Sequence, residues 1–182
     1  MSPHLPVPLP PELSTAFAQV DAFVMDMDGV LTDGFTYAFE TGEGVRRFQI
    51  KDGYALQHAV KSGYRVAIIS GGTSEGARKR FENLGITELH FGVAHKLQTF
   101  HELLLRWQLT PERVLYIGDD VPDYEVMQAA GVRCDPADAA VDILAVAQYV
   151  CQARGGFGCV REVIELALRL QGRWHSDHST KW

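Results

Sequence analysis

Two aspartates, Asp26 and Asp28, stand two residues apart at the end of an apolar run that begins at Phe23. If this run is a buried strand, side chains two residues apart leave the same face, so both carboxylates would crowd one spot. Such crowding is unfavourable unless a cation lies between the carboxylates or one of them holds a proton. Both conditions suit a site that handles phosphate, although a strand ending in a polar turn with solvated aspartates has the same short pattern.

Further polar residues follow the later apolar runs of the chain: Ser70, Lys96, and the pair Asp119 and Asp120. Each has an ordinary explanation alone. A serine often caps the next helix, a lysine is most often solvated, and an acidic pair suits a helix start. Taken together, these explanations require the same coincidence at several strand ends, so the set favours a phosphoryl-transfer site.

The chemistry that these residue types support is a two-step phosphate hydrolysis. Asp26 would attack phosphorus and form an aspartyl-phosphate. Asp28 would protonate the departing alkoxide and then take a proton from the attacking water. Ser70 and nearby backbone N–H groups would hold phosphate oxygens, and Lys96 would supply a fixed positive charge. A Mg²⁺ ion suits this carboxylate-rich site and would let an anionic nucleophile approach an anionic phosphate.

Alternating apolar strands and amphipathic helices predict the scaffold: an α/β fold with a Rossmann-like parallel sheet and helices on both faces. In such sheets the site lies beyond the carboxyl ends of the strands. Strands are expected at residues 22–27, 64–69, 89–91, 114–117, 132–134 and 149–151. Helices are expected at about residues 52–62, with Asp52 as cap, and at 74–84, 95–108, 124–130, 138–146 and after Gly158.

A β-hairpin flap is expected after the first strand, with strands at residues 35–39 and 45–50 around Gly42 and Gly44. We divide the chain into an N-terminal arm (1–20), a phosphatase-like domain (21–172) and a tail (173–182), with no cap domain. The glycines of residues 155–158 are expected to let backbone N–H groups at a helix start approach an anion.

The charge and composition of the chain limit the classes of molecule that it is expected to bind. The 182 residues carry a net charge of −6, which argues against nucleic acid or an anionic membrane as partner. No apolar run approaches membrane-spanning length, and the proline-rich N-terminus does not resemble a secretion signal. Three cysteines without framework or zinc spacing, Cys134, Cys151 and Cys159, indicate reduced thiols and a cytoplasmic protein.

These residues together resemble the four motifs of the haloacid dehalogenase superfamily: residues 26–34, Ile69-Ser70-Gly71, Lys96 and residues 118–123. More narrowly, the DGVLTDG continuation, the hairpin, Lys51-Asp52-Gly53-Tyr54 and residues 155–162 resemble its capless branch. That branch contains the phosphatases of 3-deoxy-D-manno-octulosonate 8-phosphate, in lipopolysaccharide sugar synthesis, and those of nine-carbon acid sugars such as 2-keto-3-deoxynononate or N-acylneuraminate 9-phosphate.

The resemblance implies a role for each matching position. Asp26 becomes nucleophile and metal ligand, and Asp28 the acid/base, which binds metal through its backbone carbonyl. Asp119 becomes the third metal ligand, supported by Asp120 and Asp123. The positions that match substrate contacts are Asp28, Gln49, Ile50, Lys51, Asp52, Gly53, Gly71, Arg80 and Lys96.

Two positions depart from the branch, which carries arginines where this chain has Gln57 and Gly72. We therefore expect Arg80, with the backbone of residues 49–53, to hold the carboxylate end of a phosphorylated sugar acid. Discrimination between eight- and nine-carbon acids is then expected to be loose. The resemblance also implies a homotetramer in which hairpins pack together beside neighbouring active sites.

A receiver domain and a silent assembly module are the two alternative functions for this chain. A receiver domain carries its acidic pair early and its lysine late, which is the reverse of the order here, so we reject it. A silent assembly module of the same family has no need to keep Asp26, Asp28, Ser70, Lys96 and Asp119 together.

Overall fold

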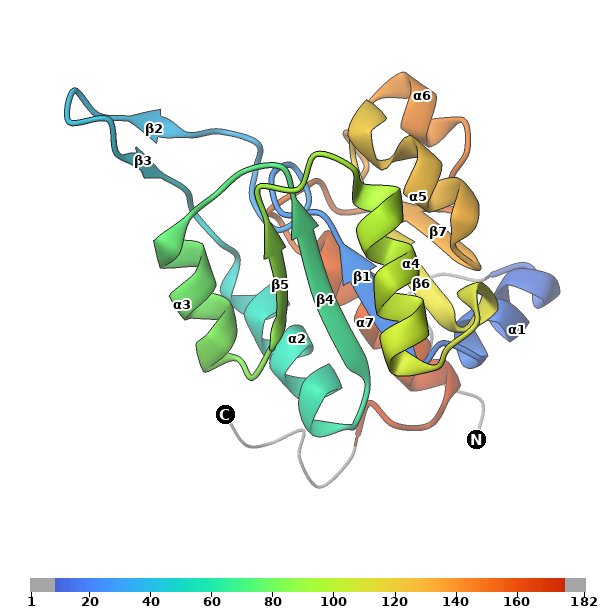
Figure 1. Ribbon diagram of the computed structural model, residues 1–182. Helices are drawn as coiled ribbons and strands as arrows, with labels where there is room; N and C mark the ends of the chain where they lie inside the picture. The colour runs from blue at the N-terminus through green and yellow to red at the C-terminus, as the bar shows by residue number, and fades with distance from the viewer. Residues whose placement is uncertain (1–8, 176–182) are drawn as a thin grey trace.

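The computed structural model, described here for residues 9–175, is built on one parallel sheet (Figure 1). Within these residues its strand order is β5-β4-β1-β6-β7-β8, and each neighbouring pair is parallel. The strands are β1 (Ala22–Met25), β4 (Arg65–Ser70), β5 (Glu88–Phe91), β6 (Val114–Ile117), β7 (Val132–Asp135) and β8 (Tyr149–Val150). The expected parallel sheet is confirmed, and β1 lies at its centre, between β4 and β6.

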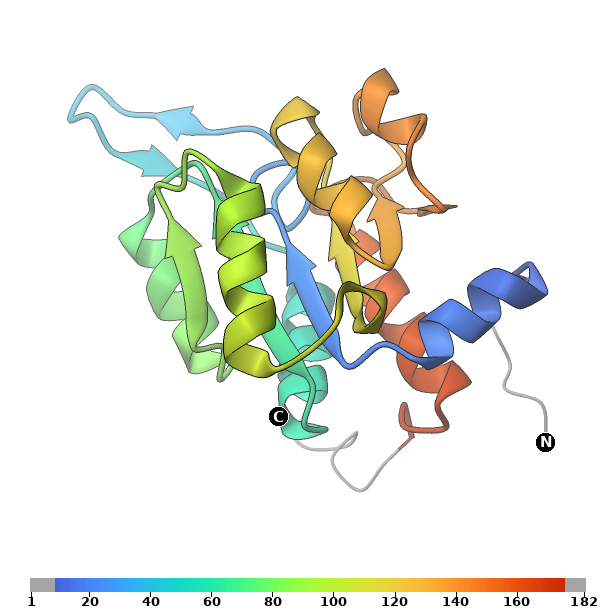
Figure 2. The same ribbon diagram turned by 45° about the vertical axis from the view of Figure 1, so that its right-hand side comes forward.

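Helices cover both faces of the sheet because alternate residues of the buried strands point to opposite sides. Phe23 and Met25 of β1 pack toward one apolar layer, and Ala22 and Val24 toward the other. The first layer is covered by α1 (Pro11–Ala18), α2 (Ile50–Lys61), α3 (Glu75–Asn83) and α7 (Cys159–Leu170). The second is covered by α4 (Lys96–Trp107), α5 (Tyr124–Ala129) and α6 (Val141–Leu144), as Figure 2 shows. Two short 3₁₀ helices, η1 (Pro111–Arg113) and η2 (Val121–Asp123), precede β6 and α5.

Two helix starts differ from the expectation. The N-cap of α2 is Gln49, whose side chain accepts from the Lys51 N–H, so the predicted capping role of Asp52 in α2 is wrong. The predicted helix at 138–146 shrinks to α6 because the Ala140 N–H donates to the Asp119 carbonyl. The Asp138 carboxylate meanwhile accepts from the Gly155 N–H. These bonds to other segments hold the first residues of that range outside the helix.

The flap is present but smaller than predicted. Its strands are β2 (Tyr37–Ala38) and β3 (Gly44–Val45), paired antiparallel, and they project from the carboxyl edge of the sheet (Figure 1). The predicted second strand at 45–50 ends early because Arg46 and Arg47 turn to carboxylates at the flap's base and Ile50 begins α2.

The apolar core extends into both segments expected to flank the domain. Phe17 of α1 and Val20 are fully buried, and Trp174 is buried beside Tyr54. Residues 1–8 of the expected arm and 176–182 of the expected tail lie outside the described residues. Within residues 9–175, no helix combines the length and the apolar character needed to cross a membrane.

Candidate active site

The sheet brings four sequence-predicted residues to its carboxyl edge. Asp26 follows β1 directly, Ser70 is the last residue of β4, Lys96 is the first residue of α4, and Asp119 lies two residues beyond β6. The backbone N–H of Asp26 continues the β1–β6 ladder by donating to the Ile117 carbonyl at 3.0 Å. The nucleophile candidate is therefore held by the sheet itself.

Lys96 is the centre of a buried ion-pair network. Its Nζ donates to Asp26 Oδ1 at 2.8 Å and to Asp123 Oδ1 at 2.7 Å. Burial lowers the pKa of Lys96, but the two carboxylates outweigh burial and leave the pKa raised above its ordinary value. The lysine is consequently an ammonium group at neutral pH, fixed beside Asp26.

Asp123, assigned a supporting role from the sequence, is the residue that joins the network together. Besides Lys96, its carboxylate accepts from the hydroxyl of Tyr116 at 2.5 Å and from the backbone N–H of Asp119 at 3.3 Å. Tyr116 is fully buried in β6 and was missed by the sequence analysis. The signal available was a hydroxyl in the otherwise aliphatic strand 114–117.

The carboxylates of Asp26, Asp119 and Asp123 offer oxygen atoms that lie within 4.8 Å of one another. Burial, followed by the neighbouring carboxylates, raises the pKa of Asp119 to about 8. Burial and then Asp123 raise the pKa of Asp26 to about 6, against the opposing effect of Lys96. One ammonium group does not neutralise three carboxylates at this spacing.

The donor set fits a divalent cation. Asp119 Oδ1 is buried and has no hydrogen-bond partner among the described residues, so a ligand position is left open there. Carboxylate oxygens are the ligands that Mg²⁺ prefers. A Cβ on Gly29, which has φ +93°, would lie 1.9 Å from Asp119 Oδ2, so this position requires glycine.

Asp28 lies beside this cluster but has a different partner. Arg46 binds it with a bidentate fork, Nε to Oδ1 at 2.6 Å and Nη2 to Oδ2 at 3.1 Å. Arg46 was also missed by the sequence analysis. The available signal was a pair of consecutive arginines, Arg46 and Arg47, on the second leg of the flap in an acidic protein.

Ser70 shapes the turn after β4 and does not cap the helix that follows. Its buried Oγ accepts from the Gly72 N–H at 3.1 Å, which shapes the exposed turn at Gly71. The N-cap of α3 is Ser74, whose side chain accepts from the Ala77 N–H. The simpler explanation of Ser70 as a helix cap is thus excluded.

Asp120 lies apart from the cluster. It is exposed, and its carboxylate accepts from the Val121 N–H at 2.8 Å, which caps η2. Its support of the site is therefore indirect, through the turn that presents Asp119.

The residues expected to contact substrate near α2 divide into two groups. Ile50 and Lys51 are exposed at the first turn, whereas Asp52 and Gly53 are buried. Asp52 Oδ1 accepts from the Arg161 N–H at 2.7 Å, so this carboxylate caps α7 from a neighbouring helix. The anion expected at the glycine-rich start of α7 is therefore Asp52 of the protein itself.

Arg80 also has structural partners in this region. Its Nη2 donates to the Gln49 carbonyl at 3.5 Å, and its guanidinium lies 5.5 Å from the centre of the Phe48 ring. Burial lowers the pKa of Arg80, and Asp52 opposes this shift. Arg80 therefore packs against the start of α2.

The glycine pair before α7 supports the catalytic turn directly. A Cβ on Gly155 would lie 1.8 Å from the Gly29 carbonyl oxygen, and the Gly156 N–H donates to the Val30 carbonyl at 2.9 Å. These glycines allow two backbones to approach closely, which places α7 against the turn that carries Asp28.

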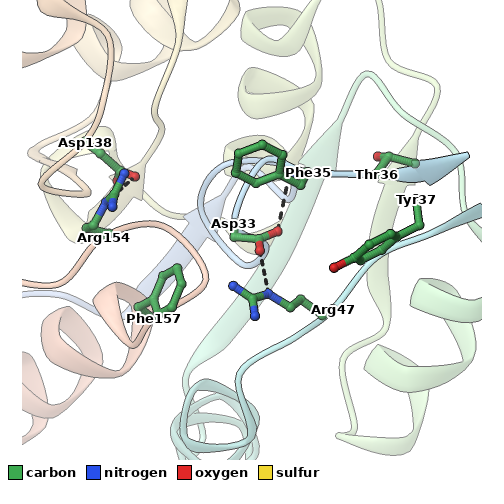
Figure 3. A pocket seen from close by; sticks show the side chains of 8 residues that line it. All are labelled: Asp33, Phe35, Thr36, Tyr37, Arg47, Asp138, Arg154 and Phe157. Carbon is green, nitrogen blue, oxygen red and sulfur yellow. Dashed lines mark hydrogen bonds and ion pairs between the residues drawn. The ribbon is translucent and has the colours of Figure 1, made fainter.

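A cavity of about 350 Å³ lies at the flap's base, next to this turn (Figure 3). Arg47 and Arg154 line it, and each is paired with a carboxylate, of Asp33 and Asp138 respectively. Figure 3 shows Phe157 near Arg47, whose guanidinium lies 5.1 Å from the ring centre.

Comparisons with known proteins identify the family of this chain. Residues 43–131 match the family model of haloacid dehalogenase-like hydrolases. The chain is 38% identical over 166 residues to 3-deoxy-D-manno-octulosonate 8-phosphate phosphatase KdsC of Salmonella typhimurium, covering 91% of this chain and 88% of that protein.

Solved structures match over similar spans. The phosphatase of that name from Yersinia pestis superposes with a TM-score of 0.89 at 38% identity, covering 91% of this chain and 90% of the other. The one from Moraxella catarrhalis, solved with magnesium ion, phosphate ion and a KDO molecule, has a TM-score of 0.86 at 33% identity, with 88% and 92% covered. On this sequence similarity, shared fold and strand-end arrangement, the chain belongs to the haloacid dehalogenase-like hydrolases and is a phosphatase.

Proposed function

We propose that this phosphatase hydrolyses a phosphorylated 2-keto-3-deoxy sugar acid through an aspartyl-phosphate intermediate. The first candidate substrate is 3-deoxy-D-manno-octulosonate 8-phosphate, and the alternatives are phosphates of nine-carbon acid sugars. The observation that carries the mechanism is the position of Asp26. Its carboxylate ends the central strand, 2.8 Å from the ammonium of Lys96 and among acidic groups that suit a Mg²⁺ ion. The substrate class comes from relatives named for that activity over most of this chain.

In the first step, an oxygen of Asp26 attacks phosphorus, and the bond from phosphorus to the sugar oxygen breaks. Asp28, which takes up a proton from solvent before this step, gives that proton to the departing alkoxide. In the second step, Asp28 takes a proton from water, whose oxygen attacks the same phosphorus and displaces the Asp26 carboxylate. Phosphate leaves, and both aspartates return to their starting states.

The other residues stabilise charge during these steps. Lys96 holds Asp26 in place and faces the phosphoryl oxygens, and the N–H groups of the turn shaped by Ser70 serve as further donors. Asp26, Asp119 and the backbone carbonyl of Asp28 would hold Mg²⁺, which would neutralise charge on the phosphoryl group. Asp123 keeps Lys96 between the carboxylates.

The chain would act in the cytoplasm, in lipopolysaccharide sugar synthesis, as a homotetramer. Three buried free cysteines, Cys134, Cys151 and Cys159, fit a reducing compartment. The flap exposes Phe35, Tyr37 and Phe39, by 74%, 64% and 55%, and such an apolar surface is typical of a contact surface. A monomer in light scattering at micromolar concentration would contradict the assembly.

The function is tested by phosphate release from a substrate panel. The panel contains the eight-carbon acid, two nine-carbon acids and neutral sugar phosphates, each assayed with Mg²⁺ and with a chelator. We expect Mg²⁺-dependent hydrolysis that favours the acids. Hydrolysis of the neutral sugars alone would refute the proposed substrate class, and full activity in the chelator would refute the metal requirement.

A further inference from the structure

Two consecutive arginines fasten the flap to the catalytic turn from opposite sides. Arg46 binds Asp28 with its bidentate fork, and Arg47 binds Asp33 at 2.5 Å. Figure 3 shows the Arg47 side of this arrangement, where the guanidinium points to Asp33 at the wall of the cavity. Neighbouring side chains of an extended segment point to opposite sides, so one arginine faces the active site and the other does not.

The two ion pairs differ in their surroundings. The Arg46 side chain is 14% exposed and its partner Asp28 is 34% exposed. For Arg47 and Asp33 the values are 61% and 9%. In the pair at the active site, the carboxylate is thus the accessible member and the guanidinium is enclosed, which suits an arginine that serves a ligand entering from the side of Asp28.

Gly72 leaves room for the ends of the Asp28 and Arg46 side chains. A Cβ at Gly72 would lie 2.9 Å from Asp28 Oδ2, 3.2 Å from Arg46 Nη2 and 3.6 Å from Ser70 Oγ. The guanidinium therefore occupies space beside the turn that shapes the phosphate site. A side chain at position 72 would crowd the Asp28 carboxylate and the Arg46 guanidinium.

The chemistry of Asp28 shows which part of the substrate Arg46 faces. Asp28 protonates the departing sugar oxygen in the proposed mechanism, so groups bound to Asp28 lie on the leaving-group side of phosphorus. Lys96 is fixed on the other side by Asp26 and Asp123. Arg46 is the cation bound to Asp28, and its planar fork, which binds one carboxylate here, has the geometry to bind another.

We infer that Arg46 is the specificity residue of this phosphatase and binds the carboxylate of the sugar acid in place of the Asp28 carboxylate. A new partner for the fork releases the oxygens of Asp28 for the leaving group. The inference rests on the proposed function, because it assigns the acid group of that substrate. The inference assigns recognition of the substrate carboxylate to Arg46 and not to Arg80, which packs against the start of α2.

The test compares the acid sugar phosphate with its C1 amide, which keeps the shape and removes the negative charge. Wild-type enzyme should prefer the acid in kcat/KM by roughly 10- to 100-fold, the range for a charge-assisted bidentate contact. Arg46→Ala should lower kcat/KM for the acid roughly 10- to 100-fold more than it lowers kcat/KM for the amide, so that the preference for the acid disappears. Arg46→Lys should retain part of it, because charge remains but the fork is lost.

Arg47→Ala is the matched control, since it removes the neighbouring arginine and the other ion pair of the flap. It should leave the preference for the acid unchanged, as should Arg80→Ala. An equal loss on acid and amide in Arg46→Ala would reduce Arg46 to an anchor for Asp28 and overturn the inference. Loss of the preference in Arg80→Ala alone would transfer the role to Arg80.

Two further measurements distinguish failure of this inference from failure of the proposed function. If wild-type enzyme hydrolyses neutral sugar phosphates and rejects every acid, the proposed function itself fails. If circular dichroism shows that Arg46→Ala is not folded, Arg46→Lys replaces it in the comparison. The inference is then overturned if Arg46→Lys keeps the full preference for the acid substrate and is inhibited equally by the free sugar acid and its amide. Inhibition by the free sugar acid, a measurement independent of turnover, should weaken in Arg46→Lys.

Discussion

At the carboxyl edge of the sheet, Asp26 and Asp123 are buried and share the ammonium of Lys96, whereas at the flap's base Asp28 is one-third exposed and shares its carboxylate with Arg46. The first group is held by strands and a helix start. In the second group, Asp28 lies on the turn after β1, and Arg46 lies on the two-stranded hairpin that projects from the domain (Figure 1). An isolated hairpin is marginally stable in water. In the proposed mechanism, the two aspartates that act on phosphorus therefore lie directly after the central strand β1, whereas Arg46, the proposed contact with the sugar acid, lies on the flap.

The largest expected effect comes from the rigid region. Asp26→Asn removes the nucleophile, so hydrolysis should fall below detection, measured as phosphate release with circular dichroism as the check on folding. Asp28→Asn should also slow hydrolysis severely, because the acid/base is lost. Substantial turnover by purified Asp26→Asn would end the covalent mechanism.

Lys96→Met should destabilise the protein by about 3–5 kcal/mol, since it leaves two buried carboxylates without their cation. The matched control is Lys79→Met, which removes an exposed lysine 3.8 Å from Glu75 and should change stability by less than about 1 kcal/mol. Both are measured by urea denaturation. Similar losses of stability for the two lysine variants would mean that the buried ion pairs of Lys96 contribute no more to the free energy of unfolding than an exposed pair does.

Mg²⁺ should stabilise the wild-type protein, because a ligand that binds the native state adds about 2.7 kcal/mol at one hundred times its dissociation constant. The gain should be smallest in Asp119→Asn, where a carboxylate with an unpartnered oxygen is replaced by an amide. The measurement is the melting temperature with Mg²⁺ and with a chelator. An equal gain in Asp119→Asn and wild type would place the ion elsewhere.

Tyr116→Phe should cost roughly 1.5–3 kcal/mol, the range for a hydrogen bond to a charged group, because Asp123 loses its hydroxyl donor. Its control, Tyr124→Phe, removes a hydroxyl that accepts from exposed Gln128 at 3.0 Å and should be nearly neutral. Denaturant midpoints compare the two. A neutral Tyr116→Phe would show that Lys96 and the Asp119 N–H are sufficient to hold Asp123.

The smallest effect concerns Asp135, at the end of β7, which is fully buried and whose two carboxylate oxygens have no partner among the described residues. Burial raises its pKa to about 7. The stability linked to this group is therefore complete below its unfolded pKa near 4 and is lost as the pH rises through 7.

Asp135→Asn should remove that dependence, so its stability relative to wild type should rise by about 1 kcal/mol between pH 6 and pH 8. Asp142→Asn, which alters an exposed carboxylate, is the control and should follow wild type. Parallel pH profiles for Asp135→Asn and wild type would indicate that the carboxylate has a solvent partner.

The scaffold and the positions of the proposed reacting groups along it could be predicted from the amino-acid sequence. Strand and helix periods are local properties, and the carboxyl ends of parallel strands meet at one edge, so Asp26, Ser70, Lys96 and Asp119 could be expected together before any coordinates. Their order along the chain and the turn at Gly29 also distinguished the family. These predictions needed no knowledge of which side chains touch.

The hydrogen-bond or ion-pair partner of each charged group became apparent from the three-dimensional structure. Tyr116 holds Asp123, Asp52 caps α7 and not α2, and Arg46 binds Asp28 across 18 positions of sequence. Arg80 packs against α2 because α3 lies beside it. The partner of a charged side chain depends on distance, burial and geometry. These depend on how separate helices and strands pack, so they leave no local pattern in the sequence.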